Sequence, residues 1–470
     1  MEKEMNFFKE KLKDSFDAKF REVETELGTA TCIFIDVLCG SSFISEYIVA
    51  PLMQYKEGIK SIEDLALKTL SINSVGYPKD EEDALLHILS GDVIIIFKDI
   101  QGMIYCEAKG FARRGVGIPV TESVLKGPRE GFTECFADNV ALIRRRIKNH
   151  NLKFETIYCG EKSQTVVCIT YLKGIAPKEL IDSIREKINN MEYEFILDTN
   201  YIEDKLRAKK TAFDTIGYTE KPDEIVAKIM EGRVGVIVDG TPFVITAPFF
   251  FLENFHTPDD YYLNKYFVNL SRGLRWLAFV LAMFLPGLYV AIVIYHFSMI
   301  PSVFVFRLAV SRAGVPFPTF LEVLIMMIFF QLIKEAGLRL PQPIGTAMSI
   351  VAALILGDAA VGAGLASRIT ILVIAISTVS YFLIPKAYGA VSIWSMIIVI
   401  LSSTLGLPGF FAGMLLLITH LASLKSCGYS YLFPIGTISK HNFKDLIFRG
   451  DLDKISEKVV NEDDISEKCL

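Results

Sequence analysis

Three acidic residues lie in or near the apolar region; Glu335 is next to Lys334 at the end of a segment, and the other two are the first candidates for chemistry. Asp358 lies in ILGDAAVGAG, and Glu322 lies in an apolar segment that begins near residue 318. A carboxylate in hydrocarbon costs several kcal/mol unless it is paired or hydrated. Asp358 is therefore either a polar lining of an ion path or a packing contact to a helix end or to Arg368. Glu322 faces either protein or lipid headgroups.

Small residues surround Asp358 and could bring helices close together. Faces of this kind let two helix backbones approach within a membrane. We expect this segment to form an oligomer interface or a pore wall. Its small residues are Gly357, Ala359, Ala360, Gly362, Ala363 and Gly364.

A second candidate group is a cluster of arginines between two ordered regions. Arg144, Arg145 and Arg146 crowd the end of an amphipathic pattern, where positive charge favours a helix C-terminus. Arg129 and Glu130 lie upstream in GPREGF. One interpretation is that these arginines are solvated or hold two subdomains together. The other is that Arg129 and the cluster form an anion site or a partner site.

Motifs for catalysis and metal binding are missing from the sequence. It has no GxxxxGK[ST] phosphate loop, no GxGxxG, no HExxH and no GxSxG. Its six histidines are scattered, and its eight cysteines have no CxxC or zinc spacing. The net charge of −5 gives no electrostatic basis for nucleic-acid binding. We expect no enzyme activity, no cofactor, no metal and no nucleic-acid partner.

The elements that must position these residues belong to two different environments. Residues 276–424 hold only 9 charged residues in 149, whereas the rest of the chain holds 94 in 321. The mean hydropathy of +0.38 therefore averages a water-soluble N-terminal part and a membrane-embedded part. We expect four to six transmembrane helices. The six apolar segments are about 276–297, 318–333, 343–363, 369–385, 389–406 and 408–424.

Charges at the ends of these segments predict the orientation in the membrane. With six spans, seven basic residues fall on one side and three on the other, which places the N-terminal domain and the tail in the cytoplasm. The seven are Lys265, Arg272, Arg275, Lys334, Arg339, Lys386 and Lys425. The three are Arg307, Arg312 and Arg368.

The soluble part contains an internal repeat. A strand, a glycine-containing turn and an amphipathic helix begin at Cys32 and again 136 residues later at Cys168. A helix, a glycine and a buried strand recur around Gly91 and Gly232. The repeat predicts two related α/β subdomains followed by an all-α membrane bundle.

These patterns divide the chain into seven regions. They are a charged lead-in at 1–24, an α/β subdomain at 25–110, a linker with an amphipathic helix at 111–154, a second α/β subdomain at 155–250, a juxtamembrane segment at 251–275, the bundle at 276–424, and a cytoplasmic tail at 425–470.

Several motifs closely resemble the A subunits of GerA-type spore-germination receptors. The resemblance spans about 85–434 and rests on KGPREGFTE (126–134), NVALIRRRIKNHNLKFE (139–155), YLKGIAPKELI (171–181), EGRVGVIVDGTPFVITAPFFF (231–251), PDDYY (258–262), KEAGLRLPQPIGTAMSIVAALILGDAAVGAGLAS (334–367) and ITHLASLKSCGYSYLFP (418–434). The stage V sporulation AF proteins are a similar group, but GPREGF rather than GARDGF favours the receptor subunit. Asp358 departs from the Gln or Glu often found in the family.

The resemblance implies a multi-pass protein of the spore inner membrane. Its implied partners are a transporter-like B subunit, a lipoprotein C subunit, further copies of itself and membrane lipid. It implies an oligomer around a germinant-gated cation path. Two alternatives are a non-conducting scaffold or signal relay and a secondary transporter, although residues 276–424 show no clear internal symmetry.

Overall fold

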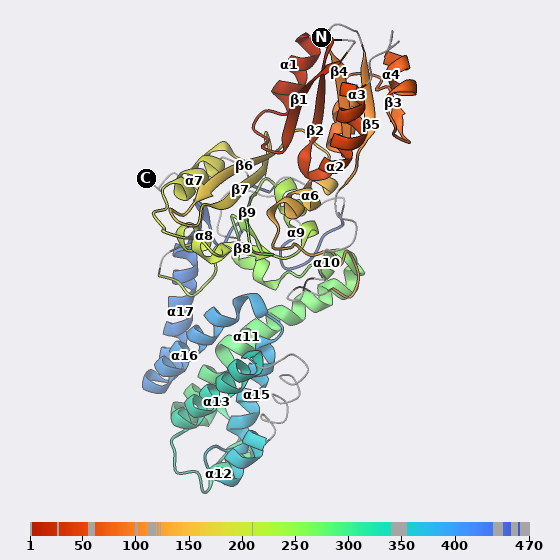
Figure 1. Cartoon of the computed structure of the whole chain (residues 1–470). Helices are drawn as coiled ribbons and strands as arrows, with labels where there is room; N and C mark the ends of the chain where they lie inside the picture. The colour runs from red at the N-terminus through yellow and green to blue at the C-terminus, as the bar shows by residue number, and fades with distance from the viewer. Residues whose placement is uncertain are drawn as a thin grey trace.

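The structure is a computed structural model that describes residues 2–25, 28–54, 62–98, 102–110, 119, 122, 124–208, 210–339, 355–435, 445–452 and 459–460. Figure 1 shows two α/β units at one end of the molecule and a helical bundle at the other. The α/β character expected for the N-terminal region is confirmed.

The first α/β unit is an antiparallel five-stranded sheet covered by helices on both faces. Cys32 and Phe34 pack on one face and Ile33 and Ile35 on the other, because successive side chains of a strand alternate. The strands, in sheet order, are β1 (Ala18–Thr25), β2 (Gly28–Ile35), β4 (Asp92–Phe97), β5 (Met103–Glu107) and β3 (Val75–Gly76). One face carries α1 (Glu2–Lys11) and α5 (Glu81–Leu89). The other lies under α2 (Ser41–Phe43), η2 (Ile44–Val49), α3 (Ala50–Gln54) and α4 (Ile62–Lys68), and η1 (Asp36–Leu38) follows β2.

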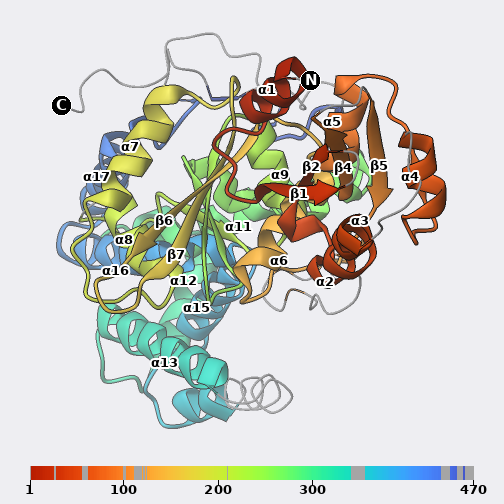
Figure 2. The same cartoon turned by 45° about the horizontal axis from the view of Figure 1, so that its top comes forward.

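The second unit has a sheet with the same strand order. Its strands are β6 (Leu152–Cys159), β7 (Thr165–Leu172), β9 (Val234–Val238), β10 (Val244–Ala247) and β8 (Gly217–Thr219). One face packs on α7 (Lys178–Asn189) and α8 (Thr199–Leu206), and the other on α6 (Phe136–Arg146) and α9 (Pro222–Met230). Figure 2 shows the two sheets side by side.

The repeated sequence segments occupy equivalent places in the two sheets. Cys32 lies in β2 and Cys168 in β7, the second strand of each order. Gly91 and Gly232 follow α5 and α9 with φ of 94° and 97°. A residue with a side chain rarely adopts this conformation, so glycine is favoured where these helices turn into the next strand.

The linker helix α6 joins the two units through a shared core. Val140 and Ile143 pack with the second sheet, whereas Ala141 packs with α1 and α5 of the first unit. The amphipathic pattern of the sequence therefore corresponds to a helix buried on more than one side.

The C-terminal region is helical, as expected, but its number of spans stays a prediction. Among the described residues, two helices, Lys265–Tyr295 and Pro385–Leu405, are long and apolar enough to cross a membrane. The segment predicted at 343–363 lies largely outside the described residues, and only 355–362 are seen to be helical. The elements are η3 (Phe251–Phe255), α10 (Asp259–Tyr262), α11 (Lys265–Tyr295), η4 (Phe297–Met299), α12 (Ser302–Arg312), α13 (Thr319–Arg339), α15 (Arg368–Tyr381), η5 (Pro385–Ala387), α16 (Tyr388–Leu405) and α17 (Leu407–Ser423).

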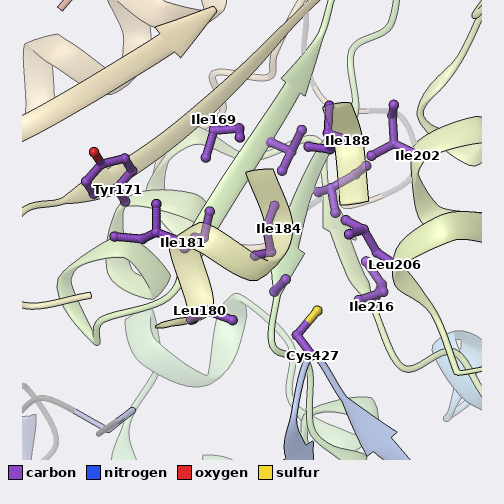
Figure 3. Packing of buried hydrophobic residues seen from close by; sticks show 14 of the residues in the cluster. Ile169, Tyr171, Leu180, Ile181, Ile184, Ile188, Ile202, Leu206, Ile216 and Cys427 are labelled. Carbon is purple, nitrogen blue, oxygen red and sulfur yellow. The ribbon is translucent and has the colours of Figure 1, made fainter. Parts of the chain in front are cut away.

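After α17 the chain returns to the second α/β unit. The short strands β11 (Lys425–Ser426) and β12 (Tyr429–Ser430) place Cys427 and Tyr429 in its hydrophobic core. Figure 3 shows Cys427 beside the cluster that α7 and α8 form. The amides of Val459 and Val460 donate to the carbonyl oxygen of Glu231, at 3.0 and 3.2 Å.

Candidate functional site

Asp358 lies on the surface of the isolated chain. It is exposed within the helical stretch 355–362. A Cβ atom added at Gly357 or Gly362 would meet no atom of the described residues within 4 Å, so the described part of the chain leaves these two positions uncovered. Its assignment as a pore wall or oligomer interface stays a prediction.

Glu322, in contrast, is completely buried in the bundle. Its Oε2 atom accepts hydrogen bonds from the backbone N–H of Ser367 at 3.0 Å and from the hydroxyl of Thr370 at 2.9 Å. Arg312 Nε lies 3.3 Å from its Oε1 atom. Because Ser367 is the N-cap of α15, Glu322 places negative charge at the positive end of that helix. Glu322 therefore faces protein.

The arginines of α6 lie in two different environments. Arg144 is fully buried, donates to both carboxylate oxygens of Asp17 at 2.8 and 3.1 Å, and also donates to the carbonyl oxygen of Leu152. It therefore links the start of β1 to the start of β6.

The remaining members of the predicted arginine group lie at the surface. Arg146 donates to Glu130 at 2.8 Å, and Arg145 lies 3.6 Å from the same carboxylate. Arg129 is exposed. An anion or partner site here would thus consist of Arg129 together with Arg145 and Arg146, which lie beside Glu130. Arg144 would not belong to it.

A group of buried charges lies at the start of α11. Asp260, just before α11, accepts bidentate hydrogen bonds from Arg275 at 2.7 and 2.8 Å and one from Arg272 at 2.9 Å. Arg272 also donates to Asp445 at 2.6 Å, and Asp445 accepts from the hydroxyl of Tyr261 at 2.6 Å. We call Asp260, Tyr261, Arg272, Arg275 and Asp445 the junction network.

Electrostatics explain why these charges are tolerated. Burial alone would raise the pKa of Asp260, but the hydrogen bonds from Arg275 and the charge of Arg272 outweigh it and hold that pKa below its usual value. A buried pair of this kind stabilises the fold only while both partners are present. The junction network therefore ties the start of α11 to α10 and to Asp445 of the C-terminal segment.

A second buried group stands beside the junction network. Glu253 accepts from Arg233 at 2.5 Å and pairs with Lys228. Burial would raise its pKa, yet the charges of Arg233 and Lys228 lower it to about 2. Both cations come from the second α/β unit, so η3 is held against that unit.

A third contact joins the bundle to the soluble region at the α15–α16 connection. Lys386 Nζ lies 3.4 Å from Glu122 and 3.5 Å from Glu224. Glu122 also accepts from the Thr219 hydroxyl at 2.6 Å. Burial and the nearby charge of Glu224 raise the pKa of Glu122, even though Lys386 opposes this effect.

Sequence reasoning missed the role of these junction charges. From the sequence, Arg272, Arg275 and Lys386 are only charges that set orientation. Asp260 lies in PDDYY, a motif that points only to the family resemblance, and Asp445 lies in the tail. The available signal was that these three basic residues lie at the ends of apolar segments. Asp260 precedes the apolar region and Asp445 follows it.

The described residues contain no group of three or more His, Cys, Asp and Glu side chains that could hold a metal ion. The buried charges of the site are arginine–carboxylate and lysine–carboxylate pairs. Through Lys386, one of these pairs joins the α15–α16 connection to Glu122 and Glu224.

Comparison with known proteins shows the family of this chain. The family described as Bacillus/Clostridium GerA spore germination protein matches residues 6–460. The chain belongs to the GerA family. The resemblance inferred from the sequence motifs is therefore confirmed.

Relatives align over nearly the whole chain. Spore germination protein KA of Bacillus subtilis (strain 168) is 32% identical over 449 residues, which cover 94% of this chain and 82% of the relative. Spore germination protein GerLA of Bacillus cereus is 31% identical over 454 residues, covering 95% and 92%. The uncharacterized membrane protein YfkQ of Bacillus subtilis (strain 168) is 33% identical over 440 residues, covering 92% and 85%.

The chain is also similar to a solved structure. The crystal structure of the N-terminal domain of the A subunit of the Bacillus megaterium spore germinant receptor GerK3 is 26% identical and covers 52% of this chain and 92% of that chain, with a TM-score of 0.38.

Proposed function

We propose that this GerA-family protein is the A subunit of a nutrient germinant receptor in the spore inner membrane. The observation that carries the proposal is the family match over residues 6–460. Relatives named as spore germination proteins, aligned over most of their lengths, support it. The proposal assigns no catalysis to the chain and gives it a transporter-like B subunit and a lipoprotein C subunit as partners, with the N-terminal domain in the cytoplasm.

The junction supports a role in transmitting a signal. The helix α11 runs from the junction network into the bundle, and Lys386 ties a second bundle segment to Glu122 and Glu224. Movement of the soluble region relative to its partners would therefore be passed to two places in the bundle at once.

The finer part of the proposal is a cation path formed by several copies of the chain. Its support is the helical stretch 355–362, where Asp358 is exposed and the glycines at 357 and 362 meet no other described residue. A second copy could approach closely there. Glu322 is assigned a supporting role, because its carboxylate is bonded to the start of α15.

Nutrient-triggered potassium release from spores tests the cation path. We expect Asp358→Ala to reduce the rate of release by removing the polar lining, and Gly362→Leu to reduce it by blocking close contact. Glu335→Ala is the matched control, because Glu335 is an exposed acid that pairs with Arg339 one turn away. Immunoblots establish equal amounts of each variant. Unchanged potassium release in both test variants would contradict the assignment.

A gene deletion and a pull-down test the receptor role itself. Deletion of the gene is expected to abolish the response of spores to one class of nutrient, while germination induced without nutrients continues. The tagged chain is expected to retain the B and C subunits in mild detergent. A deletion strain that responds normally to every nutrient tested would contradict the role.

The second candidate function is a non-conducting scaffold. The exposed side chain of Arg129 favours this function. It lies in GPREGF, next to Glu130, which pairs with Arg146. In that case Arg129→Ala would slow germination, whereas Asp358→Ala would not.

A further inference from the structure

A basic cavity lies where the second α/β unit meets the end of α17. Its volume is about 480 Å³. Lys187, Arg207 and Lys210 line it from the soluble region, and His420 and Lys425 line it from the end of the bundle. The described residues that line the cavity include four Lys or Arg side chains and no Asp or Glu.

Acidic groups outside the cavity act on its Arg207, since Glu203 and Asp214 both interact with this guanidinium electrostatically. The carboxylate of Asp204 lies 3.7 Å from Arg207 Nε, and it is itself largely exposed to water. In the described structure that Nε atom is buried and makes no hydrogen bond. Several cations held together repel one another, so an anion that enters the cavity is favoured. A guanidinium beside lysines matches the oxygens of a phosphate group.

The position of the cavity indicates which phosphate it meets. It opens where α17 ends, and the apolar side chains of Leu415, Leu416 and Ile418 on the last turns before it are at least half exposed. The neighbouring helix of the pair, α16, belongs to a segment long and apolar enough to span a membrane. The cavity therefore lies at the depth of lipid headgroups, where basic pockets beside membrane helices bind anionic lipids.

We propose that this cavity binds the headgroup phosphate of an anionic phospholipid, with the acyl chains along the exposed apolar side of α17. The headgroup bridges the soluble region and the bundle. A hydrogen bond of 3.0 Å between Thr211 and His420 already holds the two walls of the cavity together. A bound phosphate adds a charged contact between the same walls.

Binding of phosphatidylglycerol by the full-length protein tests the proposal. The protein is placed in nanodiscs of phosphatidylcholine with a small fraction of phosphatidylglycerol, and lipid retained by the protein is measured by native mass spectrometry. Lys187→Gln/Lys210→Gln is expected to weaken retention of phosphatidylglycerol by about 30-fold, because each basic residue near anionic lipid contributes roughly a fivefold change. Both lysines are exposed, so the fold is expected to survive.

A matched control removes lysines that lie outside the cavity. Lys148→Gln/Lys173→Gln replaces two exposed lysines that do not line it and is expected to retain lipid like the wild type. Arg207→Gln is the second test variant, and its melting temperature in pure phosphatidylcholine checks that it is folded. Equal retention by the wild type and both test variants overturns the proposal. Protection from unfolding by inorganic phosphate that matches the protection by phosphatidylglycerol also overturns it, because the ligand is then a free anion.

Discussion

At the scale of single residues, the junction network changes the pKa of a neighbouring histidine, His256. His256 lies partly buried beside the junction network, and desolvation and the charge of Arg272 lower its pKa to about 4. Its Nε2 atom lies 2.9 Å from the carbonyl oxygen of Leu446, so the neutral ring carries its proton on that nitrogen. In an unfolded chain the same ring takes up a proton near pH 6.5.

This difference predicts a loss of stability in mild acid. Between pH 6.5 and about 4, the unfolded state binds one more proton at His256 than the folded state, so the free energy of unfolding falls as the pH falls. The loss approaches about 1.4 kcal/mol per pH unit. Thermal unfolding of the full chain in detergent between pH 7 and 4.5 should show a shallower pH dependence for His256→Gln. Identical slopes for the two proteins would refute the assignment, since titrating carboxylates affect both alike.

Arg144 gives a second prediction for a single residue. Arg144→Ala leaves Asp17 buried without its cation and is expected to cost about 3–5 kcal/mol of unfolding free energy. Arg145→Ala, which removes a partly exposed arginine 3.6 Å from Glu130, is expected to cost below about 1 kcal/mol. Chemical denaturation followed by circular dichroism measures both. Similar costs for the two variants would count against the buried linkage.

At the scale of elements, glycines show which helices touch. A Cβ atom added at Gly409 in α17 would lie 2.0 Å from the carbonyl oxygen of Leu401, and one added at Gly287 in α11 would lie 2.7 Å from Ile398. Sequence reasoning instead favours the glycines beside Asp358, which are open in one chain. A small-residue pattern indicates that close approach is allowed, but it does not identify the neighbouring helix.

The contrast between glycines can be measured. Gly409→Ala is expected to lower the melting temperature of the detergent-solubilised protein, because backbone atoms of α16 must move to make room. The methyl group of Gly273→Ala in α11 would meet no described atom within 4 Å and the change replaces a poor helix former, so the melting temperature of this variant should stay the same or rise. A larger loss for Gly273→Ala than for Gly409→Ala would contradict the packing.

At the scale of the whole molecule, charges distant in sequence join separate regions of the chain. Arg272 and Asp445 are 173 residues apart, and Lys386 meets Glu122 and Glu224. Hydrophobic periodicity can indicate apolar helices because it is a local signal. The constant offset between repeated segments can indicate two α/β units because the signal is duplicated. Pairings across such separations leave no local pattern, so the junction network could not be read from one sequence.

The coupling through Lys386 makes a prediction for the whole molecule. Lys386→Gln leaves Glu122 and Glu224 facing each other without a cation, so hydrogen–deuterium exchange at 217–230 should become faster. Lys265→Gln is the control, because its partner Asp451 is half exposed and such pairs contribute little. Unchanged exchange in Lys386→Gln would show that this contact does not hold the two regions together.

The return of the chain after α17 has a consequence for the order of biosynthesis. The core of the second α/β unit contains Cys427, Tyr429 and Val460. These residues leave the ribosome only after all the helices of the bundle have been made. The first unit can therefore fold early, whereas the second must wait with part of its core unfilled until the bundle is inserted. Newly made chains should be most sensitive to proteases in the second unit until synthesis passes residue 460.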